Sequence, residues 1–323
     1  MGPDKRLDGG VLRANVAAFA ALGAPVAAVL KNDGYGWGAR RLARELDGVV
    51  ESYVVGDLDE LAALRPATEK PVRLLSDAPP GMLGRVLDLG GIANVSTRAA
   101  LAEASAEAGR RGGLTVRVGV LDAGGWYAIA PPDAPSFAIA VAEAGLAVEL
   151  WTHLSSAARS GAILDGFVAA QRAFEAAGVR VVSLDAAATA GARRGLAFDR
   201  LRVGVGLFGS RLGASVDVAC ALRVDAPVVL RFGPGERAWA GYGDTPIPAN
   251  RTAVVLRCGY GDGLPRGIAG SADILSVGMQ YTVRLTSEER DPCELIGESD
   301  DVDALAARAG ISPHELVVGL APR

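Results

Sequence analysis

The residue with the clearest chemical potential in this sequence is Lys31. It follows the apolar run 25–30 and precedes the turn-forming segment 32–38, which is rich in glycine. We expect the run to be a buried strand, at whose end the ammonium group of Lys31 is partly removed from water. Burial disfavours the charged form and makes the amine a nucleophile, and nearby glycines let the backbone approach a ligand closely. The pattern favours a lysine that forms a Schiff base with an aldehyde cofactor; the alternative is a solvated lysine at a strand end.

Three further residues lie where an active site needs polar groups. His153 follows the apolar run 147–151, Arg202 lies in the run 201–206, and Tyr260 lies between two glycines. If strands and helices alternate in a barrel, active-site groups project from the carboxyl ends of the strands. The alternative readings are structural: a histidine or an ion-paired arginine at a strand end, and a tyrosine in a glycine turn.

The composition argues against several classes of protein. The chain has 323 residues, 50% of them hydrophobic, and 33 Lys and Arg against 37 Asp and Glu, which gives a formal net charge of -4. This balance offers no basic surface for nucleic acid, and no run is apolar and long enough to span a membrane. Because the three cysteines are far apart and only two histidines occur, we expect neither disulfides nor a metal site. No signal peptide precedes the first expected helix, which predicts a cytoplasmic protein.

Alternation of strand-like and helix-like segments predicts an α/β fold over residues 1–210. Continuous apolar runs are typical of strands buried on both faces, and eight of them occur, at 25–30, 52–55, 71–75, 92–95, 114–121, 147–151, 179–184 and 201–206. Helical spacing appears between them, at 39–46, 57–64, 97–111 and 156–178, and before the first of them, at 11–22. We therefore expect a (β/α)8 TIM-type barrel. An open doubly wound sheet is the alternative, but no GxGxxG segment follows an early strand.

The sequence pattern changes after about residue 210, from alternating strand-like and helix-like segments to mainly strand-like ones. Strand-like segments at 216–229, 252–258 and 281–285 are separated by glycine and proline turns, and a short helix is expected at 302–309. A smaller, mainly β C-terminal domain over residues 211–323 fits this pattern.

Five ordered segments of this chain resemble alanine racemase, the fold-type III family of enzymes that depend on pyridoxal 5′-phosphate. They are Ala28-Val29-Leu30-Lys31-Asn32-Asp33-Gly34-Tyr35-Gly36, Thr152-His153, the segment 202–209, Gly241-Tyr242-Gly243-Asp244-Thr245 and Gly259-Tyr260-Gly261-Asp262-Gly263. The resemblance covers nearly the whole chain. It implies a homodimer with shared active sites, a pyridoxal 5′-phosphate cofactor and a small amino acid as substrate.

The resemblance also assigns catalytic roles. Lys31 would hold the cofactor and act as base on one face of the substrate's α-carbon, and Tyr260 of a second subunit would act on the other face. Racemisation requires a proton to leave from one side and return on the other, so two bases are the minimum. His153 and Arg202 would bias Tyr260 towards its anion through a hydrogen-bonded chain. Arg202 would face the pyridine nitrogen, which stays unprotonated because arginine does not give up its proton.

The cofactor's phosphate also has candidate ligands. Tyr35 offers a hydroxyl, and the backbone N–H groups of Gly204 and Val205 could form a small anion site near the eighth strand, where barrels often hold phosphates. The family's phosphate-binding serine corresponds to Ala187, for which Thr189 could compensate.

Several positions depart from the family pattern. Val120 and Tyr127 stand where the family has a modified lysine and the arginine that clamps the substrate carboxylate, so Tyr127 becomes the substrate-binding candidate. Met279 matches the family's substrate-site methionine, but Gln280 replaces the acid that follows it. Trp37 replaces a histidine. In addition, Arg323 ends the sequence before the family's final phosphate-binding tyrosine.

Three readings follow. The first is a two-base amino acid racemase that acts on alanine or a related small amino acid. The second is a pyridoxal phosphate enzyme of another reaction type, such as decarboxylation, that acts on a modified amino acid. The third is a degenerate paralogue that binds the cofactor without catalysis.

Overall fold

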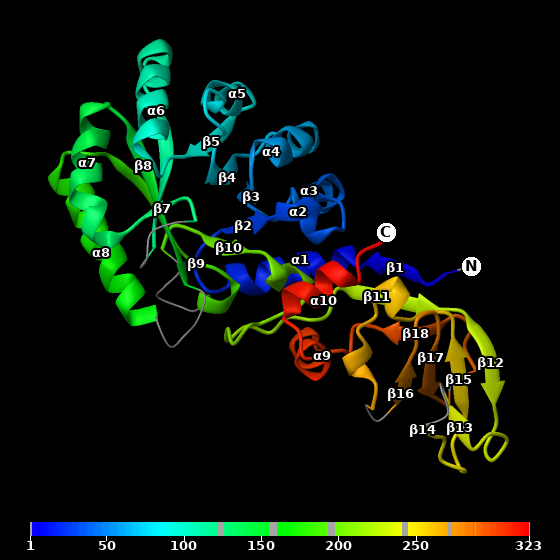
Figure 1. The fold of residues 1–323 in the computed structure, drawn as a ribbon. Helices are drawn as coiled ribbons and strands as arrows, with labels where there is room; N and C mark the ends of the chain where they lie inside the picture. Colours follow the sequence, from blue (N-terminus) through cyan, green and yellow to red (C-terminus); the bar gives the residue numbers. More distant parts are fainter. Residues whose placement is uncertain are drawn as a thin grey trace. The chain divides into compact units, whose positions relative to one another are not determined.

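The computed structural model describes residues 2–121, 126–154, 160–192, 198–240, 245–270, 273–287 and 289–322. The chain forms two compact units, both visible in Figure 1. The first consists of Arg13–Leu207 and Arg211–Asp217, and the second of Met1–Leu12, Phe208–Ser210 and Val218–Arg323. The division into domains over residues 1–210 and 211–323 stays a prediction.

The first unit is a nearly closed barrel of parallel strands, which confirms the expected fold class. Its eight strands pair in the order β10-β2-β3-β4-β5-β6-β8-β9, and a single parallel bridge between Ala188 and Arg202 joins the two ends. The strands are β2 (Val26–Val29), β3 (Ser52–Val55), β4 (Val72–Asp77), β5 (Gly91–Asn94), β6 (Thr115–Val120), β8 (Ala147–Leu154), β9 (Val181–Ala187) and β10 (Leu201–Val203). A short extra strand, β7 (Ala128–Ile129), pairs with β6.

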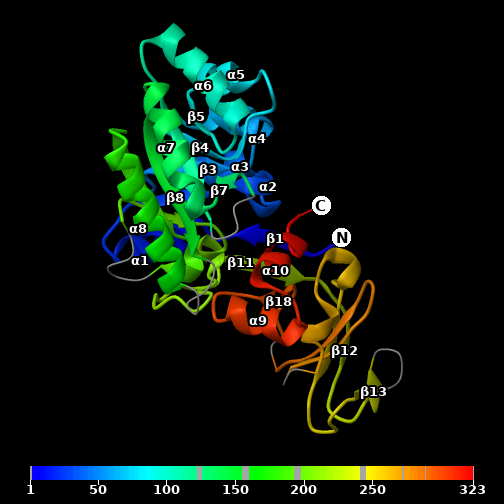
Figure 2. The ribbon, with the colours of Figure 1, turned by 60° about the vertical axis from the view of Figure 1, so that its left-hand side comes forward.

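Helices cover the outside of these strands, as Figures 1 and 2 show. They are α3 (Ala39–Leu46), α4 (Leu58–Leu64), α5 (Leu83–Asp88), α6 (Arg98–Arg111), α7 (Ala134–Glu143) and α8 (Ser160–Ala176). Polar caps set where two of them begin: Asp57 accepts the N–H of Glu60 at 3.0 Å before α4, and Thr97 accepts that of Ala100 at 3.1 Å before α6.

Some expected boundaries were wrong for local reasons. The first helix, α1 (Gly9–Ala20), begins two residues earlier than expected, because the Asp8 side chain accepts the N–H of Val11 at 3.1 Å and caps it there. The apolar run 201–206 is not one strand, since the chain turns into the 3-10 helix η4 (Val205–Phe208) after β10. Apolar character alone cannot separate a strand from a buried turn.

The barrel interior holds a network of buried ion pairs that the sequence did not reveal. Glu149 receives two hydrogen bonds from Arg73, at 2.6 and 2.9 Å, and Asp185 lies 3.2 Å from Arg117 and 2.9 Å from Arg200. All five residues are buried. Burial opposes ionisation of Glu149, but hydrogen bonding and the charges of the surrounding arginines outweigh it and hold its pKa below the usual value.

Breaking this network should destabilise the protein strongly. Glu149→Gln leaves Arg73 without its buried anion, which typically costs about 3–5 kcal/mol of unfolding free energy, measurable by urea denaturation. Because the folded-state pKa of Glu149 is lowered, its contribution is present above the unfolded pKa of about 4.3 and is lost as the pH falls through the folded value. The stability of the variant should therefore fall less steeply at acid pH than that of the wild type.

The control is Glu45→Gln, which removes the exposed ion pair with Arg13. It should lower the unfolding free energy by at most about 1 kcal/mol; equal losses in the two variants would contradict this account.

The second unit is mainly β, as expected for the C-terminal part of the chain. Its larger sheet has the order β12-β15-β17-β16, and a three-stranded sheet has the order β1-β11-β18. The elements are β1 (Asp4–Leu7), β11 (Leu222–Ala226), β12 (Val228–Phe232), β15 (Ala253–Leu256), β16 (Ile274–Val277), β17 (Thr282–Leu285), β18 (Cys293–Ile296), a hairpin of β13 (Trp239–Ala240) and β14 (Thr245–Pro246), and the helices α9 (Val302–Ala309) and α10 (Pro313–Gly319). The expected strand 216–229 is replaced by β11 and β12, which flank Pro227, a residue with no N–H to donate.

In the parts of the chain that the structure describes, no helix is apolar and long enough to cross a membrane. The same described residues contain no cluster of three or more His, Cys, Asp or Glu side chains that could hold a metal ion.

Candidate active site

Lys31 lies immediately beyond the end of the first barrel strand. β2 ends at Val29, Leu30 is fully buried, and Lys31 is the first residue of the short helix α2 (Lys31–Tyr35) and is exposed. The expectation that Lys31 is partly removed from water was therefore wrong for the single chain, in which the residue is exposed. The reason is geometric: Lys31 stands past the end of β2 rather than within it.

The residues after Lys31 form a left-handed turn. The backbone φ angle lies between 50 and 64° at Asn32, Asp33, Gly34 and Tyr35. Residues other than glycine rarely adopt this conformation. The turn is held by local bonds: the N–H of Gly34 donates to the carbonyl of Leu30 at 2.9 Å, and the Asp33 carboxylate accepts the N–H of Ala39 at 2.8 Å at the start of α3. Backbone strain of this kind is concentrated at functional sites.

The turn brings Tyr35 against the loop that follows β10. Tyr35 is 4% exposed, and burial raises the pKa of its phenol, so the hydroxyl stays protonated. A Cβ added to Gly204 would lie 2.1 Å from that hydroxyl, so only glycine fits there. Thr189 also reaches this loop, since its hydroxyl accepts the N–H of Gly206 at 3.4 Å. Tyr35, Gly204, the adjoining Val205 and Thr189, which are the candidate phosphate ligands, thus lie in one place.

Arg202 is the central buried cation at the strand ends. It is 3% exposed and donates from Nη2 to the carbonyl of Thr152, the residue before His153. Its Cζ lies 5.0 Å from the ring centroid of Trp151. Burial lowers the pKa of Arg202, which Asp185 partly offsets. Among the described residues, Arg202 Nη1 has no hydrogen-bond partner although it is buried, whereas His153 on β8 is exposed.

Tyr260 and Met279 lie together in the second unit. The N–H of Tyr260 donates to the carbonyl of Gly278 at 2.9 Å, and the N–H of Gly261 donates to that of Met279 at 2.8 Å. Tyr260 is half-buried, and the guanidinium carbon of Arg266 lies 5.5 Å from its ring centroid. The loop that carries the phenol is therefore tied to the strand connection that carries Met279.

Tyr127 immediately precedes β7 and is 52% exposed, while Val120, at the position of the family's modified lysine, is buried. The intervening residues 122–125 lie outside the described residues, as do Gly241–Asp244 of the fourth resemblance segment and Arg323.

The sequence analysis missed the residues that surround these candidates. Asp77 and Asn94 are the last residues of β4 and β5, and Asn94 also binds Trp151 within β8; each of the three ends or nearly ends an apolar run. Polar and aromatic residues at strand ends are the signal that could have identified them.

The fold and the arrangement of these residues define a (β/α)8-barrel protein with a C-terminal β unit. The same fold is found in the crystal structure of alanine racemase from Bartonella henselae with covalently bound pyridoxal phosphate, at a TM-score of 0.78, 18% identity and coverage of 99% of this chain and 98% of that one. Residues 7–212 match the family "Alanine racemase, N-terminal domain", and the chain belongs to that family.

Full-length relatives carry the same similarity. The alanine racemase of Acidiphilium cryptum is 29% identical over 359 residues, which cover 99% of this chain and 97% of the relative. That of Methylobacterium sp. (strain 4-46) is 27% identical over 329 residues, with 94% and 90% covered.

Proposed function

We propose that this protein is a pyridoxal 5′-phosphate-dependent racemase of a small amino acid. Lys31 and Tyr260 would act as the two bases, and each active site would combine Lys31 of one copy with Tyr260 of a second copy. The observation that carries the proposal is the difference in exposure and hydrogen bonding among the three lysine amines of the chain.

The sequence contains only Lys5, Lys31 and Lys70. Lys5 and Lys70 are half-buried and donate to backbone carbonyls, Lys70 to that of Val50 at 2.5 Å. Lys31 is exposed at the end of a barrel strand, and among the described residues no hydrogen bond engages its amine. Lys31 is therefore the most accessible of the three amines to an aldehyde.

The residues near Lys31 fit the cofactor in two respects. The buried Nη1 of Arg202 lacks a partner among the described residues, and a pyridine nitrogen would accept its hydrogen. Tyr35, with the backbone of Gly204 and Val205, offers a hydroxyl and N–H donors for the phosphate. When bound, pyridoxal phosphate supplies an electron sink that makes the α C–H of an amino acid acidic.

Gly204→Ala should weaken cofactor binding. The added methyl group would lie 2.1 Å from the Tyr35 hydroxyl, and such overpacking typically costs about 1–3 kcal/mol. Titration of the apoprotein with pyridoxal phosphate should show a raised dissociation constant. Wild-type affinity in Gly204→Ala would place the phosphate elsewhere.

The remaining chemistry falls to the side chains of the two copies. Lys31 would hold or move a proton at one face of the α-carbon, and the Tyr260 phenol at the other. Tyr260 is held by the bond of its N–H to Gly278 and by the ring contact with Arg266.

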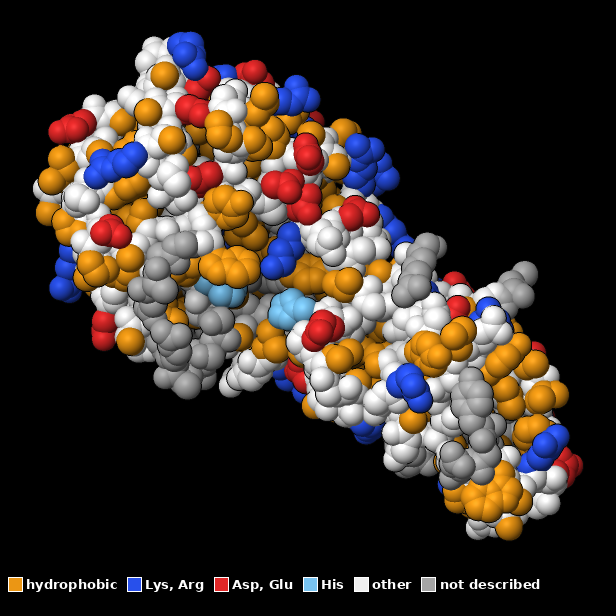
Figure 3. All heavy atoms as spheres, viewed as in Figure 1, with side chains coloured by type: hydrophobic (Ala, Val, Ile, Leu, Met, Phe, Trp, Pro, Cys, Tyr) orange, Lys and Arg blue, Asp and Glu red, His pale blue; other side chains and the backbone are white. Residues whose placement is uncertain are grey.

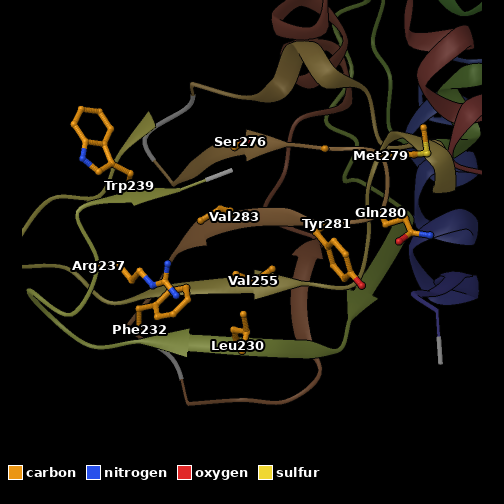
Figure 4. Close-up of a pocket in the computed structure, with 11 residues that line it drawn as sticks. Leu230, Phe232, Arg237, Trp239, Val255, Ser276, Met279, Gln280, Tyr281 and Val283 are labelled. Carbon is orange, nitrogen blue, oxygen red and sulfur yellow. The ribbon is translucent and has the colours of Figure 1, made fainter. Parts of the chain in front are cut away.

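The surface beside Met279 supports the homodimer. A groove of about 510 Å³ crosses the four-stranded sheet of the second unit. Leu230, Val255, Val283 and Ser276 form one row across its strands. Met279, Gln280 and Tyr281 lie on one side of this row, and Trp239 and Arg237 lie on the other (Figure 4). Hydrophobic side chains are exposed over this unit (Figure 3), among them Leu230, Trp239 and Met279, each more than half exposed. Exposed aromatic, Met and Arg side chains of this kind are enriched at protein interfaces.

The test is direct. Purified protein, pyridoxal phosphate and L-alanine are incubated, and the D-enantiomer is measured by chiral chromatography, followed by a panel of other small amino acids. Formation of the opposite enantiomer is expected; no turnover with any of them would reject a racemase.

One observation favours a second candidate, a pyridoxal phosphate enzyme that acts on a modified amino acid. Tyr127, half exposed and uncharged, stands where the family has the arginine for the substrate carboxylate. A substrate with a masked carboxylate would not need that cation. The same panel, extended to amino acid amides and scored also for CO2 release, separates the two candidates.

A further inference from the structure

One indole ring lies between the cofactor-facing and substrate-facing candidates of the barrel. Trp151 on β8 is 5% exposed. Its ring centroid lies 5.0 Å from the guanidinium carbon of Arg202 and 5.3 Å from that of Arg117, within the range of cation–π attraction. The guanidinium groups of Arg202 and Arg117 therefore both contact the Trp151 ring.

The polar end of the same ring is also used. Trp151 Nε1 donates to Asn94 Oδ1 at 2.8 Å, and Asn94 Nδ2 donates to Asp77 Oδ1 at 2.7 Å and to the carbonyl of Tyr127 at 2.8 Å. Because an indole N–H can only donate, it determines which way the amide of Asn94 points. Asn94 is fully buried, so an unpaired atom on it would be costly.

The backbone that Asn94 holds is strained. Trp126 and Tyr127 have φ values of 48° and 61°, in the left-handed region that residues with side chains rarely occupy. Such conformations persist only when neighbouring contacts hold them, and the bond from Asn94 to the carbonyl of Tyr127 is such a contact.

The ring has no room to move towards the barrel wall. A Cβ added to Gly119 on β6 would lie 2.7 Å from the indole. The ring is thus packed on one side and hydrogen-bonded at its edge.

We infer that Trp151 and Asn94 are positioning residues that hold the Arg202 guanidinium and the Tyr127 backbone in one fixed arrangement. The inference rests on the proposed function for what these two groups contact. It links cofactor placement to substrate recognition through a single side chain.

Two substitutions at one position separate the two contacts. Trp151→Phe removes the N–H but keeps a ring beside Arg202, so the KM should rise by about 5–30-fold from the unpaired Asn94 oxygen, while the dissociation constant of pyridoxal phosphate stays within about twofold of wild type. Trp151→Leu removes the ring as well, and that dissociation constant should also rise, by about 3–30-fold.

Tyr53→Phe is the matched control. It removes another buried aromatic donor of the barrel, whose hydroxyl donates to the carbonyl of Ala43 at 2.8 Å, and it should leave both constants near wild type. A rise in KM for Tyr53→Phe equal to that for Trp151→Phe would overturn the inference, and so would wild-type constants in both Trp151 variants.

Hydrogen exchange of the apoprotein tests the arrangement without cofactor or substrate. Amides of residues 126–130 should exchange faster in Trp151→Phe than in the wild type and in Tyr53→Phe. Unchanged exchange would overturn the inference even in an active enzyme. Wild-type protein that binds no pyridoxal phosphate would reject the proposed function instead, and the exchange result would still decide whether Trp151 holds this backbone.

Discussion

Replacing Lys31 by alanine is expected to remove both the covalent attachment of pyridoxal phosphate and the racemase activity. Turnover should fall by at least about 10⁴-fold, because the variant loses a covalent anchor and a general base in one step. The Schiff-base absorption of the wild type should be absent from Lys31→Ala. Borohydride reduction of the wild type followed by peptide mapping should place the pyridoxyl label on residue 31.

Lys70→Ala is the matched control, because the Lys70 amine donates to the carbonyl of Val50 and is not assigned to the site. It should keep both the absorption and the activity. Label found on Lys5 or Lys70, or an absorption band that persists in Lys31→Ala, would refute the role of Lys31.

Tyr260→Phe has the second largest expected effect. Removing the phenolic oxygen takes away one of two bases, and the rate of racemisation should fall by about 10²–10⁴-fold. Cofactor binding should be unchanged, since the substitution removes only the phenolic oxygen and the loop keeps its backbone bonds to Gly278 and Met279. Lys31 alone should still exchange the α-proton of one enantiomer with D2O, which mass spectrometry can follow. Full racemisation by the variant would exclude the two-base assignment.

Mixed dimers test whether each site is shared between copies. When Lys31→Ala and Tyr260→Phe chains are unfolded, mixed and refolded together, a mixed dimer has one site with both bases and one with neither. Activity should return to about a quarter of the wild-type level at equal mixing. If each site were contained within one chain, the mixture would stay as inactive as the separate variants.

Much of the fold followed from the sequence because a parallel barrel buries both faces of its strands. Eight continuous apolar runs favoured a parallel barrel over an open sheet, and each of the eight overlaps one of its strands. Helices were equally clear where the apolar spacing was regular, as at Ala39–Leu46 and Val302–Ala309. The helix α10 was missed although Ser312 and Glu315 form a capping box around Pro313, which is a readable signal.

Other features could not be read from the chain. Arg73, Arg117, Glu149 and Asp185 look like ordinary interruptions of apolar strands, because their opposite charges are far away in the sequence: Arg73 and Glu149 are 76 residues apart, and Arg117 and Asp185 are 68 apart. The exposure of Lys31 depended on where β2 ends, and a boundary of one or two residues decides whether a side chain lies inside the barrel or beyond it.

By itself the sequence determined the order of strands and helices and the identity of the groups able to do chemistry, since both depend on local pattern and residue type. The tertiary structure alone decided which of those groups meet. Gly204 lies against Tyr35, and Trp151 binds Asn94, because strand ends far apart in the chain converge at one end of a barrel. Hydrogen bonds and ring contacts act over a few ångströms, so their partners are set by that convergence and not by spacing along the chain.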